Sequence, residues 1–100
     1  MKKYTKIQLD LYRKFRALAH PARIKLIQEL LKGEYCVGEI QKHLTLSQPN
    51  VSQHLKILKE AGIITGRRDK NRICYRISDE KIVGAINAFF KGDDKDEKRS

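Results

Sequence analysis

The sequence has no tryptophan, one methionine, two prolines and two cysteines among its 100 residues, and only 7% of them are aromatic. Two cysteines are too few to staple a disulfide-dependent mini-protein, so we expect free thiols in a reducing, cytoplasmic compartment. No stretch approaches the ~20 apolar residues that a membrane span needs, and residues 1–15 lack the apolar region of a secretory signal. The 40% hydrophobic share suffices for one domain with a modest core.

Acidic residues are also scarce. The chain has 12 of them against 22 lysines and arginines, and the net charge of +10 favours a polyanionic partner over a small acidic substrate. Positive charge is concentrated in residues 1–32 and 67–78, whereas residues 33–66 are neutral overall. Residues 92–100 alternate both signs without an apolar anchor, so we expect a disordered tail after a domain of residues 1–91.

Apolar residues at helical spacing predict two helices in the first third of the chain. The first runs to about Ala19, and the second spans residues 21–32, because Pro21 suits a first helical turn. The apolar stripe expected on the first helix is Ile7, Leu11, Phe15 and Leu18. The stripe expected to be buried on the second is Ile24, Ile27, Leu30 and Leu31.

Two further helices follow, separated by a short turn. The first is marked by Val37, Ile40 and Leu44, and Ser47 is placed to cap a second helix that runs through Ala61 and stops at Gly62. The side chains expected to face inward on this second helix are Val51, Leu55 and Leu58. Its opposite face is polar.

After Gly62 the period of the apolar residues changes from 3.6 to 2, which predicts a β-hairpin. Its strands are residues 63–68 and 72–77, and its tip is basic. One strand face, which contains Ile73, Tyr75 and Ile77, is expected to cover a core. The opposite face, expected to meet solvent or a ligand, contains Arg72, Cys74 and Arg76.

A last helix, capped by Ser78 or Asp79, has more apolar residues than an exposed terminal element needs. This surplus suggests a helix shared with a second chain. Together with the stripe on the first helix, it predicts a homodimer interface. Its expected residues are Ile7, Leu11, Phe15, Ile82, Val83, Ile86, Phe89 and Phe90.

The order of these elements predicts a mainly α fold with a β-hairpin wing, a homodimeric winged helix-turn-helix of the order α-α-α-α-β-β-α. Such a fold places one helix in the major groove of double-stranded DNA, where side chains that donate and accept hydrogen bonds read base edges. The DNA-binding residues expected on that helix are Ser47, Gln48, Asn50, Ser52, Gln53 and, at a phosphate, Lys56. Those expected on the wing are Arg68, Lys70 and Arg72.

Two stretches carry a family resemblance: ALAHPAR at residues 17–23 and SQPNVSQHLKILKEAG at residues 47–62. Both resemble the ArsR/SmtB-type repressors of bacteria and archaea, over about residues 10–90. The resemblance implies a homodimer held by the first and last helices. It also implies a pseudo-palindromic operator and release from DNA when an effector is sensed, either a metal ion or a thiol-reactive or redox signal.

The sensing site matches the family less well. Metal sensors of this type often carry Cys-Val-Cys where this chain has Cys36-Val37-Gly38, and of the family's zinc ligands on the last helix only Asp79 is present. No cofactor is therefore assigned, and Cys36 remains a candidate redox sensor, a candidate metal ligand or an inert buried thiol. Cys74 is a second sensing candidate or an incidental surface thiol. The three histidines, His20, His43 and His54, are interpreted as structural, with His54 packed against the third helix.

Enzymatic function is not predicted, because the sequence contains no glycine-rich phosphate loop, nucleophile–base pair or carboxylate dyad. The alternative hypothesis is a winged-helix module that binds protein, RNA or DNA non-specifically and senses no effector. Loss of base-reading residues separates the two hypotheses, because only a sequence reader would lose affinity for one particular duplex.

Overall fold

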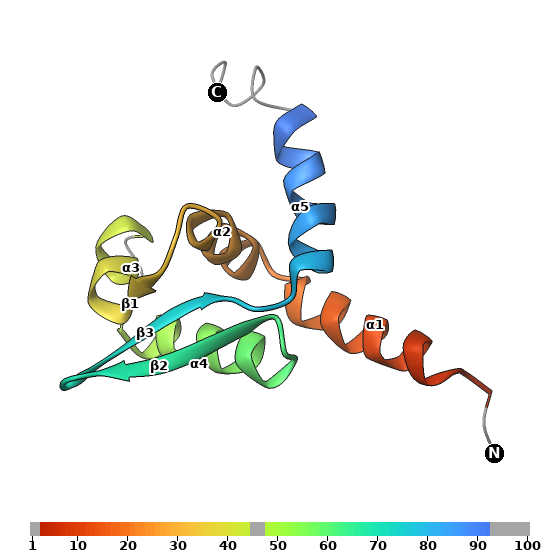
Figure 1. The fold of residues 1–100 in the computed structure, drawn as a ribbon, viewed down its shortest axis with the longest axis horizontal. Coiled ribbons are helices and arrows are strands. Elements are labelled where there is room, and N and C mark those ends of the chain that lie inside the picture. Colours follow the sequence, from red (N-terminus) through yellow and green to blue (C-terminus); the bar gives the residue numbers. More distant parts are fainter. Residues whose placement is uncertain (1–2, 45–47, 93–100) are drawn as a thin grey trace.

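The computed structural model describes residues 3–44 and 48–92, which form five helices and one small sheet whose hairpin extends to one side (Figure 1). The helices are α1 (Lys6–Leu18), α2 (Pro21–Leu30), α3 (Val37–Leu44), α4 (Gln48–Glu60) and α5 (Glu80–Gly92). The strands are β1 (Tyr35–Cys36), β2 (Ile64–Asp69) and β3 (Arg72–Ile77). The predicted winged helix-turn-helix order is confirmed, with the addition of β1. The predicted tail was residues 92–100; Gly92 ends α5, and residues 93–100 lie outside these ranges.

The sheet is antiparallel and has the strand order β1-β3-β2. Its hairpin, β2 and β3, is the predicted wing. Strand β1 was not predicted, because two residues are too few to show a period of 2. It places Tyr35 opposite Tyr75 and Cys36 opposite Cys74, so the segment just before α3 is part of the wing's sheet.

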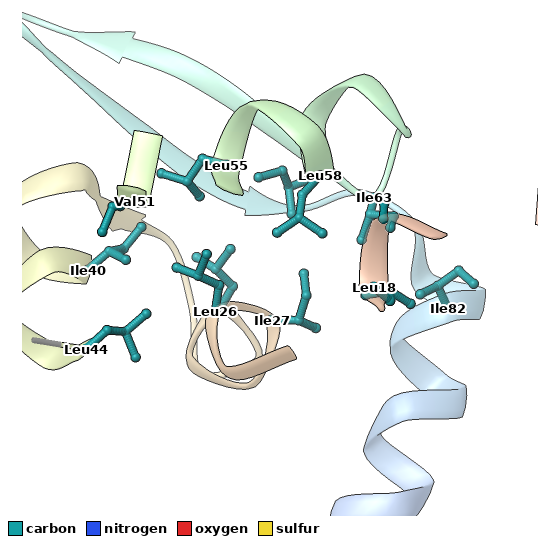
Figure 2. Close-up of a cluster of buried hydrophobic side chains, with 13 residues drawn as sticks. Leu18, Leu26, Ile27, Ile40, Leu44, Val51, Leu55, Leu58, Ile63 and Ile82 are labelled. Atoms are coloured by element: carbon teal, nitrogen blue, oxygen red, sulfur yellow. The ribbon is translucent and has the colours of Figure 1, made fainter. Parts of the chain in front are cut away.

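The core lies between α2, α3, α4 and the inner face of the wing, and Figure 2 shows its side chains converging from these elements. The predicted inward residues of α4, Val51, Leu55 and Leu58, are all 0% exposed. The stripe predicted for α2 is wrong in part: Leu26 is fully buried, whereas Ile24 is 40% exposed. The reason is that α2 packs against α3 and α4 through Leu26, Ile27 and Leu30, which leaves Ile24 outside this contact.

Side chains and backbone turns fix where the helices begin and end. Thr5 and Gln8 form a capping box at the start of α1, and the His20 ring accepts a hydrogen bond from the Ala22 N–H (3.0 Å) at the start of α2. At the end of α4, Gly62 has a φ of 79°, and the Ile63 N–H donates to the Leu58 carbonyl (3.1 Å). This is a Schellman motif, so the predicted glycine stop is confirmed.

Helix α5 begins at the base of the wing. The Asp79 carboxylate accepts a hydrogen bond from the Ile82 N–H (3.1 Å), so Asp79 is its N-cap. The Ile63 carbonyl accepts from both the Ser78 N–H (2.9 Å) and the Asp79 N–H (3.2 Å). The exit from α4 and the entrance to α5 therefore meet at one backbone oxygen.

Helices α1 and α5 project from the rest of the protein in different directions (Figure 1). Near their shared base, Leu18 and Ile82 lie in the core (Figure 2), and Lys14 of α1 is paired with Asp79 at the start of α5. Farther out their apolar side chains meet solvent: Ile7 is 78% exposed and Phe89 is 76% exposed. Within the described ranges, no helix combines the length and apolar character that crossing a bilayer requires.

Candidate nucleic-acid interface

Helix α4 presents a polar face to solvent. Its exposed side chains include Asn50, Ser52, Gln53 and Lys56, four of the six predicted for this helix. They stand opposite the fully buried Val51, Leu55 and Leu58, which fix the rotation of α4 about its axis. Amide, hydroxyl and ammonium groups on one outward face suit base edges and phosphates. Of the other two predictions, Ser47 and the side chain of Gln48 lie outside the described part of the chain.

Arginine and histidine side chains connect α4 to the start of α2. The Arg23 guanidinium donates to Nδ1 of His54 (3.2 Å) and to the Ala17 carbonyl, and the His20 ring lies 4.5 Å from that of His54 between centroids. Burial, with His20 and Arg23 nearby, lowers the pKa of His54, which favours the neutral ring that accepts from Arg23. His54 thus packs against the α1–α2 junction, not against α3 as predicted. The His43 side chain lies beyond the described residues.

The wing carries three exposed basic residues near its tip: Arg68, Lys70 and Arg72. Lys70 has a φ of 61°, the left-handed conformation that a two-residue hairpin turn requires. Arg72 is 3.5 Å from the Asp69 carboxylate, a contact among exposed groups that leaves the guanidinium in water. All three predicted wing residues are therefore available to a phosphate backbone.

Another wing arginine, Arg67, has a different environment. Its Nε and Nη2 donate to the two oxygens of Glu34, at 2.9 and 2.7 Å. This bidentate pair lowers the pKa of Glu34, chiefly through the hydrogen bonds from Arg67. Sequence reasoning did not predict the pair, because the two residues are 33 positions apart and meet only through the sheet. It anchors the root of the wing to the segment before α3.

The two cysteines are bonded to each other. Cys36 and Cys74 form a disulfide between neighbouring strands and are 6% and 2% exposed. The expectation of free thiols and the interpretation of Cys74 as a surface thiol are wrong. Arg72, Cys74 and Arg76 do share a strand face, as predicted, but Cys74 is buried there and bonded to Cys36 of the neighbouring strand β1.

The disulfide also bears on metal binding. In the bonded form, Cys36 has no thiolate to offer a metal ion. Asp79, the other residue that matched a family metal pattern, is paired with Lys14 and caps α5. Among the residues that the structure describes, no group of three or more His, Cys, Asp or Glu side chains is placed to hold a metal ion.

Residues 20–65 match the family described as bacterial regulatory protein, arsR family. The solved structure of the transcriptional repressor BigR from Xylella fastidiosa resembles this fold with a TM-score of 0.79 and 34% sequence identity, over 86% of this chain and 88% of that chain. The chain belongs to the ArsR family. HlyU from Vibrio cholerae shares the ArsR-family fold with a TM-score of 0.82 at 27% identity, over 88% of this chain and 96% of that one.

Two curated relatives extend the comparison of this ArsR-family chain. The biofilm growth-associated repressor of Agrobacterium fabrum is 43% identical over 75 residues, which are 75% of this chain and 64% of that protein. The transcriptional repressor SmtB of Mycobacterium tuberculosis is 46% identical over 71 residues, 71% of this chain and 53% of that protein. The chain thus spans between about half and two thirds of their lengths. The predicted family resemblance is confirmed.

Proposed function

We propose that this ArsR-family protein is a sequence-specific DNA-binding repressor that inserts α4 into the major groove and places the wing on the phosphate backbone. The observation that carries the proposal is the rotation of α4, whose inward side chains are completely buried while its amides and hydroxyls face solvent beside a basic hairpin. A buried face prevents α4 from turning, so its polar groups keep one register against base edges. The relatives named as repressors support the same function.

The proposed DNA-binding form is a homodimer joined through α1 and α5. Large apolar side chains on these helices remain wholly or partly exposed in one protomer: Ile7, Leu11, Phe15, Val83, Ile86, Phe89 and Phe90. Ile82, also predicted at the interface, is already buried in the protomer's own core. A second copy would cover the exposed groups and place two α4 helices in successive major-groove faces, about 34 Å apart on a pseudo-palindromic operator. Bound there, the cytoplasmic protein would block the polymerase.

Base reading is tested by comparing two alanine variants on DNA. First, the preferred duplex is selected from a random pool with the full chain. Gln53→Ala should then weaken binding to that duplex by roughly 10-fold while barely changing binding to random DNA. Arg72→Ala should weaken binding to all duplexes alike and reduce the salt slope by about one. Lys25→Ala, which removes an exposed charge from α2, is the matched control.

The same measurements address the alternative of a non-specific module. If selection yields no preferred duplex, or if Gln53→Ala affects every duplex equally, sequence reading by α4 is wrong. Fluorescence anisotropy at several salt concentrations separates these outcomes, because phosphate contacts respond to salt and base contacts largely do not.

A further inference from the structure

A cleft of about 550 Å³ lies in the angle between α1 and the base of α5 (Figure 1). This volume is many times the space of one water, so the cleft admits whole side chains. Its apolar lining comes from Ile7, Leu11 and Ile82, of which Ile7 is 78% exposed in the single protomer. Its charged lining consists of Lys6, Asp10, Arg13, Lys14, Asp79 and Lys81. One protomer therefore leaves open a cleft that combines an apolar surface with charged groups.

The charge of the cleft is mainly positive. Four cationic and two acidic side chains line it, which leaves two positive charges in excess. Lys14 is paired with both Asp10 and Asp79, so these three groups satisfy one another. The other three cations form no ion pair within residues 3–44 and 48–92. They are Lys6, Arg13 and Lys81. Such a cleft suits an acidic chain that also carries apolar side chains.

The end of α5 has the matching composition. Phe89 and Phe90 close the apolar stripe of the helix, and Phe89 is 76% exposed. Directly after Gly92 comes the acidic run Asp93-Asp94-Lys95-Asp96-Glu97, which holds four of the chain's 12 acidic residues within five positions. The run has no apolar residue, so charge, and not packing, must hold it in place. The segment from Phe89 to Glu97 therefore presents two aromatic rings followed by carboxylates.

The acidic run does not reach the cleft of its own protomer. Helix α5 has 13 residues and rises about 20 Å from its base, and it leads away from α1 (Figure 1). Five residues span at most about 17 Å when fully extended. The run would therefore end before it returned to the base of α5, and a second copy has to supply the acidic groups.

Two-fold packing of α5 brings the end of one protomer to the cleft of the other. The apolar side chains of α5 share one face, and Ile86 is at the centre of the stripe between Ile82 and Phe90. If two α5 helices pack antiparallel about Ile86, the partner's Phe90 stands level with Ile82, because each is about 6 Å along the axis from the two-fold. The same spacing puts the start of the partner's acidic run level with Asp79, which lines the cleft. Parallel packing would instead leave the cleft empty and bring the two acidic runs together, where they repel each other.

We propose that the cleft between α1 and the base of α5 binds the end of α5 from a second copy. The partner's aromatic rings cover the apolar lining, and its residues 93–97 bind Lys6, Arg13 and Lys81. The dimer contains this contact twice, because a two-fold interface is self-complementary. The contact also reduces the repulsion between two protomers that each carry a net charge of +10. This inference rests on the homodimer of the proposed function and names the groups that close it.

A charge-swap cycle with the full chain tests the acidic part of the contact. Asp93→Lys/Asp94→Lys should raise the dissociation constant of the dimer roughly 10-fold in analytical ultracentrifugation at low salt. Lys6→Glu/Lys81→Glu should weaken the dimer to a similar extent. The protein with all four substitutions should return to within about 3-fold of the parent, because the opposite charges are then exchanged across the contact. These differences should shrink at high salt, which screens exposed charges.

The control for the charge swap is Glu60→Lys/Asp69→Lys. It changes the net charge as much as the variant of the acidic run does, but both positions lie away from the cleft, on α4 and the wing. Its dimer should therefore dissociate like that of the parent. Circular dichroism checks that each variant is folded.

Cysteine cross-linking tests the direction of packing. Cys36 and Cys74 are bonded to each other, so an added cysteine supplies the free thiol. Mixing Lys81→Cys protein with Asp94→Cys protein under mild oxidation should yield a covalent heterodimer on a non-reducing gel. Asp94→Cys protein alone should yield little covalent dimer, whereas parallel packing of α5 would cross-link it to itself.

The outcomes separate this contact from the proposed function. Three results would overturn the contact and leave the homodimer in place: a dissociation constant unchanged by Asp93→Lys/Asp94→Lys, a Lys6→Glu/Lys81→Glu defect that the swap does not rescue, or a mixture without heterodimer. The second of these would mean that another acidic molecule occupies the cleft. A parent that is monomeric at every concentration would overturn the homodimer of the proposed function and the contact with it.

Discussion

The head of the protein, which consists of α2, α3, α4 and the sheet, buries its apolar residues, whereas the two outer helices, α1 and α5, leave many of theirs exposed. In the head, α2, α3, α4 and the sheet bury one another, and the inward residues of α4 have no exposed surface. In α1 and α5, only the ends that meet the head are buried, and Ile7 and Phe89 stand in solvent. The head therefore supplies its own folding energy, whereas the outer helices carry apolar surface that the described part of the chain leaves uncovered. Substitutions in the head and in the outer helices should therefore have different effects.

The largest effect is expected in the head. Leu55→Ala removes a fully buried side chain between α4 and the sheet and should lower the free energy of unfolding by about 2–5 kcal/mol. The loss should be the same at low and high protein concentration, because the cavity lies within one protomer. Urea denaturation followed by circular dichroism measures it. Lys56→Ala, one position along on the exposed face, is the control and should change stability by less than about 0.5 kcal/mol.

In the outer helices the effect should depend on concentration. Phe89→Ala should leave the fold of the protomer intact and weaken the proposed dimer by roughly 2 kcal/mol, about 30-fold in its dissociation constant. Analytical ultracentrifugation over a dilution series measures this change. Lys91→Ala, on the same helix, should leave the dimer unchanged. A parent protein that is monomeric at all concentrations would show that the apolar faces of α1 and α5 have another role.

Within the head, the wing offers a smaller and more local test. A Cβ at Gly66 would lie 2.8 Å from Cε1 of the Tyr75 ring, which packs across the hairpin, so Gly66→Ala must displace the ring. We expect a loss of about 1–2 kcal/mol in thermal unfolding. Gly38→Ala is the matched control, because a Cβ there meets nothing within 4 Å and alanine favours helix α3, so it should stabilise the protein by roughly 0.5–1 kcal/mol. An unchanged melting temperature for Gly66→Ala would contradict the close ring packing.

The smallest effect concerns the contact that joins the outer helices to each other. Lys14 holds the pKa of Asp79 below its ordinary value of 3.8, chiefly through a side-chain hydrogen bond. A carboxylate whose pKa is lower in the folded state stabilises the fold above its unfolded pKa, and this contribution disappears as the pH falls through the folded value. Asp79→Asn keeps an N-cap but should cost roughly 1 kcal/mol at pH 7 and flatten the loss of stability below pH 4.

Asp10 provides the control for this last test. Its carboxylate contacts the same lysine at 3.2 Å but is 60% exposed, so Asp10→Asn should have little effect. Denaturation curves recorded from pH 7 down to about pH 3 compare the two variants. Equal acid sensitivity in Asp79→Asn and in the parent would show that the contact with Lys14 does not bridge α1 and α5 in solution.

Local patterns in the sequence predicted most of the fold. The start of α2 at Pro21 and the end of α4 at Gly62 follow from the backbone chemistry of single residues. The inward stripe of α4 follows from the helical period. The hairpin follows from the change of period after Gly62. The exposed residues of the DNA-facing helix, Asn50, Gln53 and Lys56 among them, could be predicted because each lies opposite the apolar stripe of α4.

What could not be predicted depends on partners distant in the sequence. The Cys36–Cys74 bond and the Arg67–Glu34 pair both require β1, whose two residues show no periodicity of their own. The exposure of Ile24 depends on which side of α2 faces α3 and α4, and an apolar count does not determine this. The contact of His54 with Arg23 and His20 likewise arises from the tertiary approach of α4 to the α1–α2 junction.

The backbone oxygen of Ile63 has a mechanical consequence. It receives the N–H groups of Ser78 and Asp79, and the Ser78 hydroxyl donates to the adjacent Gly62 carbonyl (3.1 Å), so the first turn of α5 is hinged on the last turn of α4. A tilt of α5 would act on these hydrogen bonds together with the packing of Ile82 in the core and the Lys14–Asp79 pair. If two protomers are joined through α5, a tilt of α5 about the Ile63 carbonyl changes the distance between the two α4 helices of the dimer.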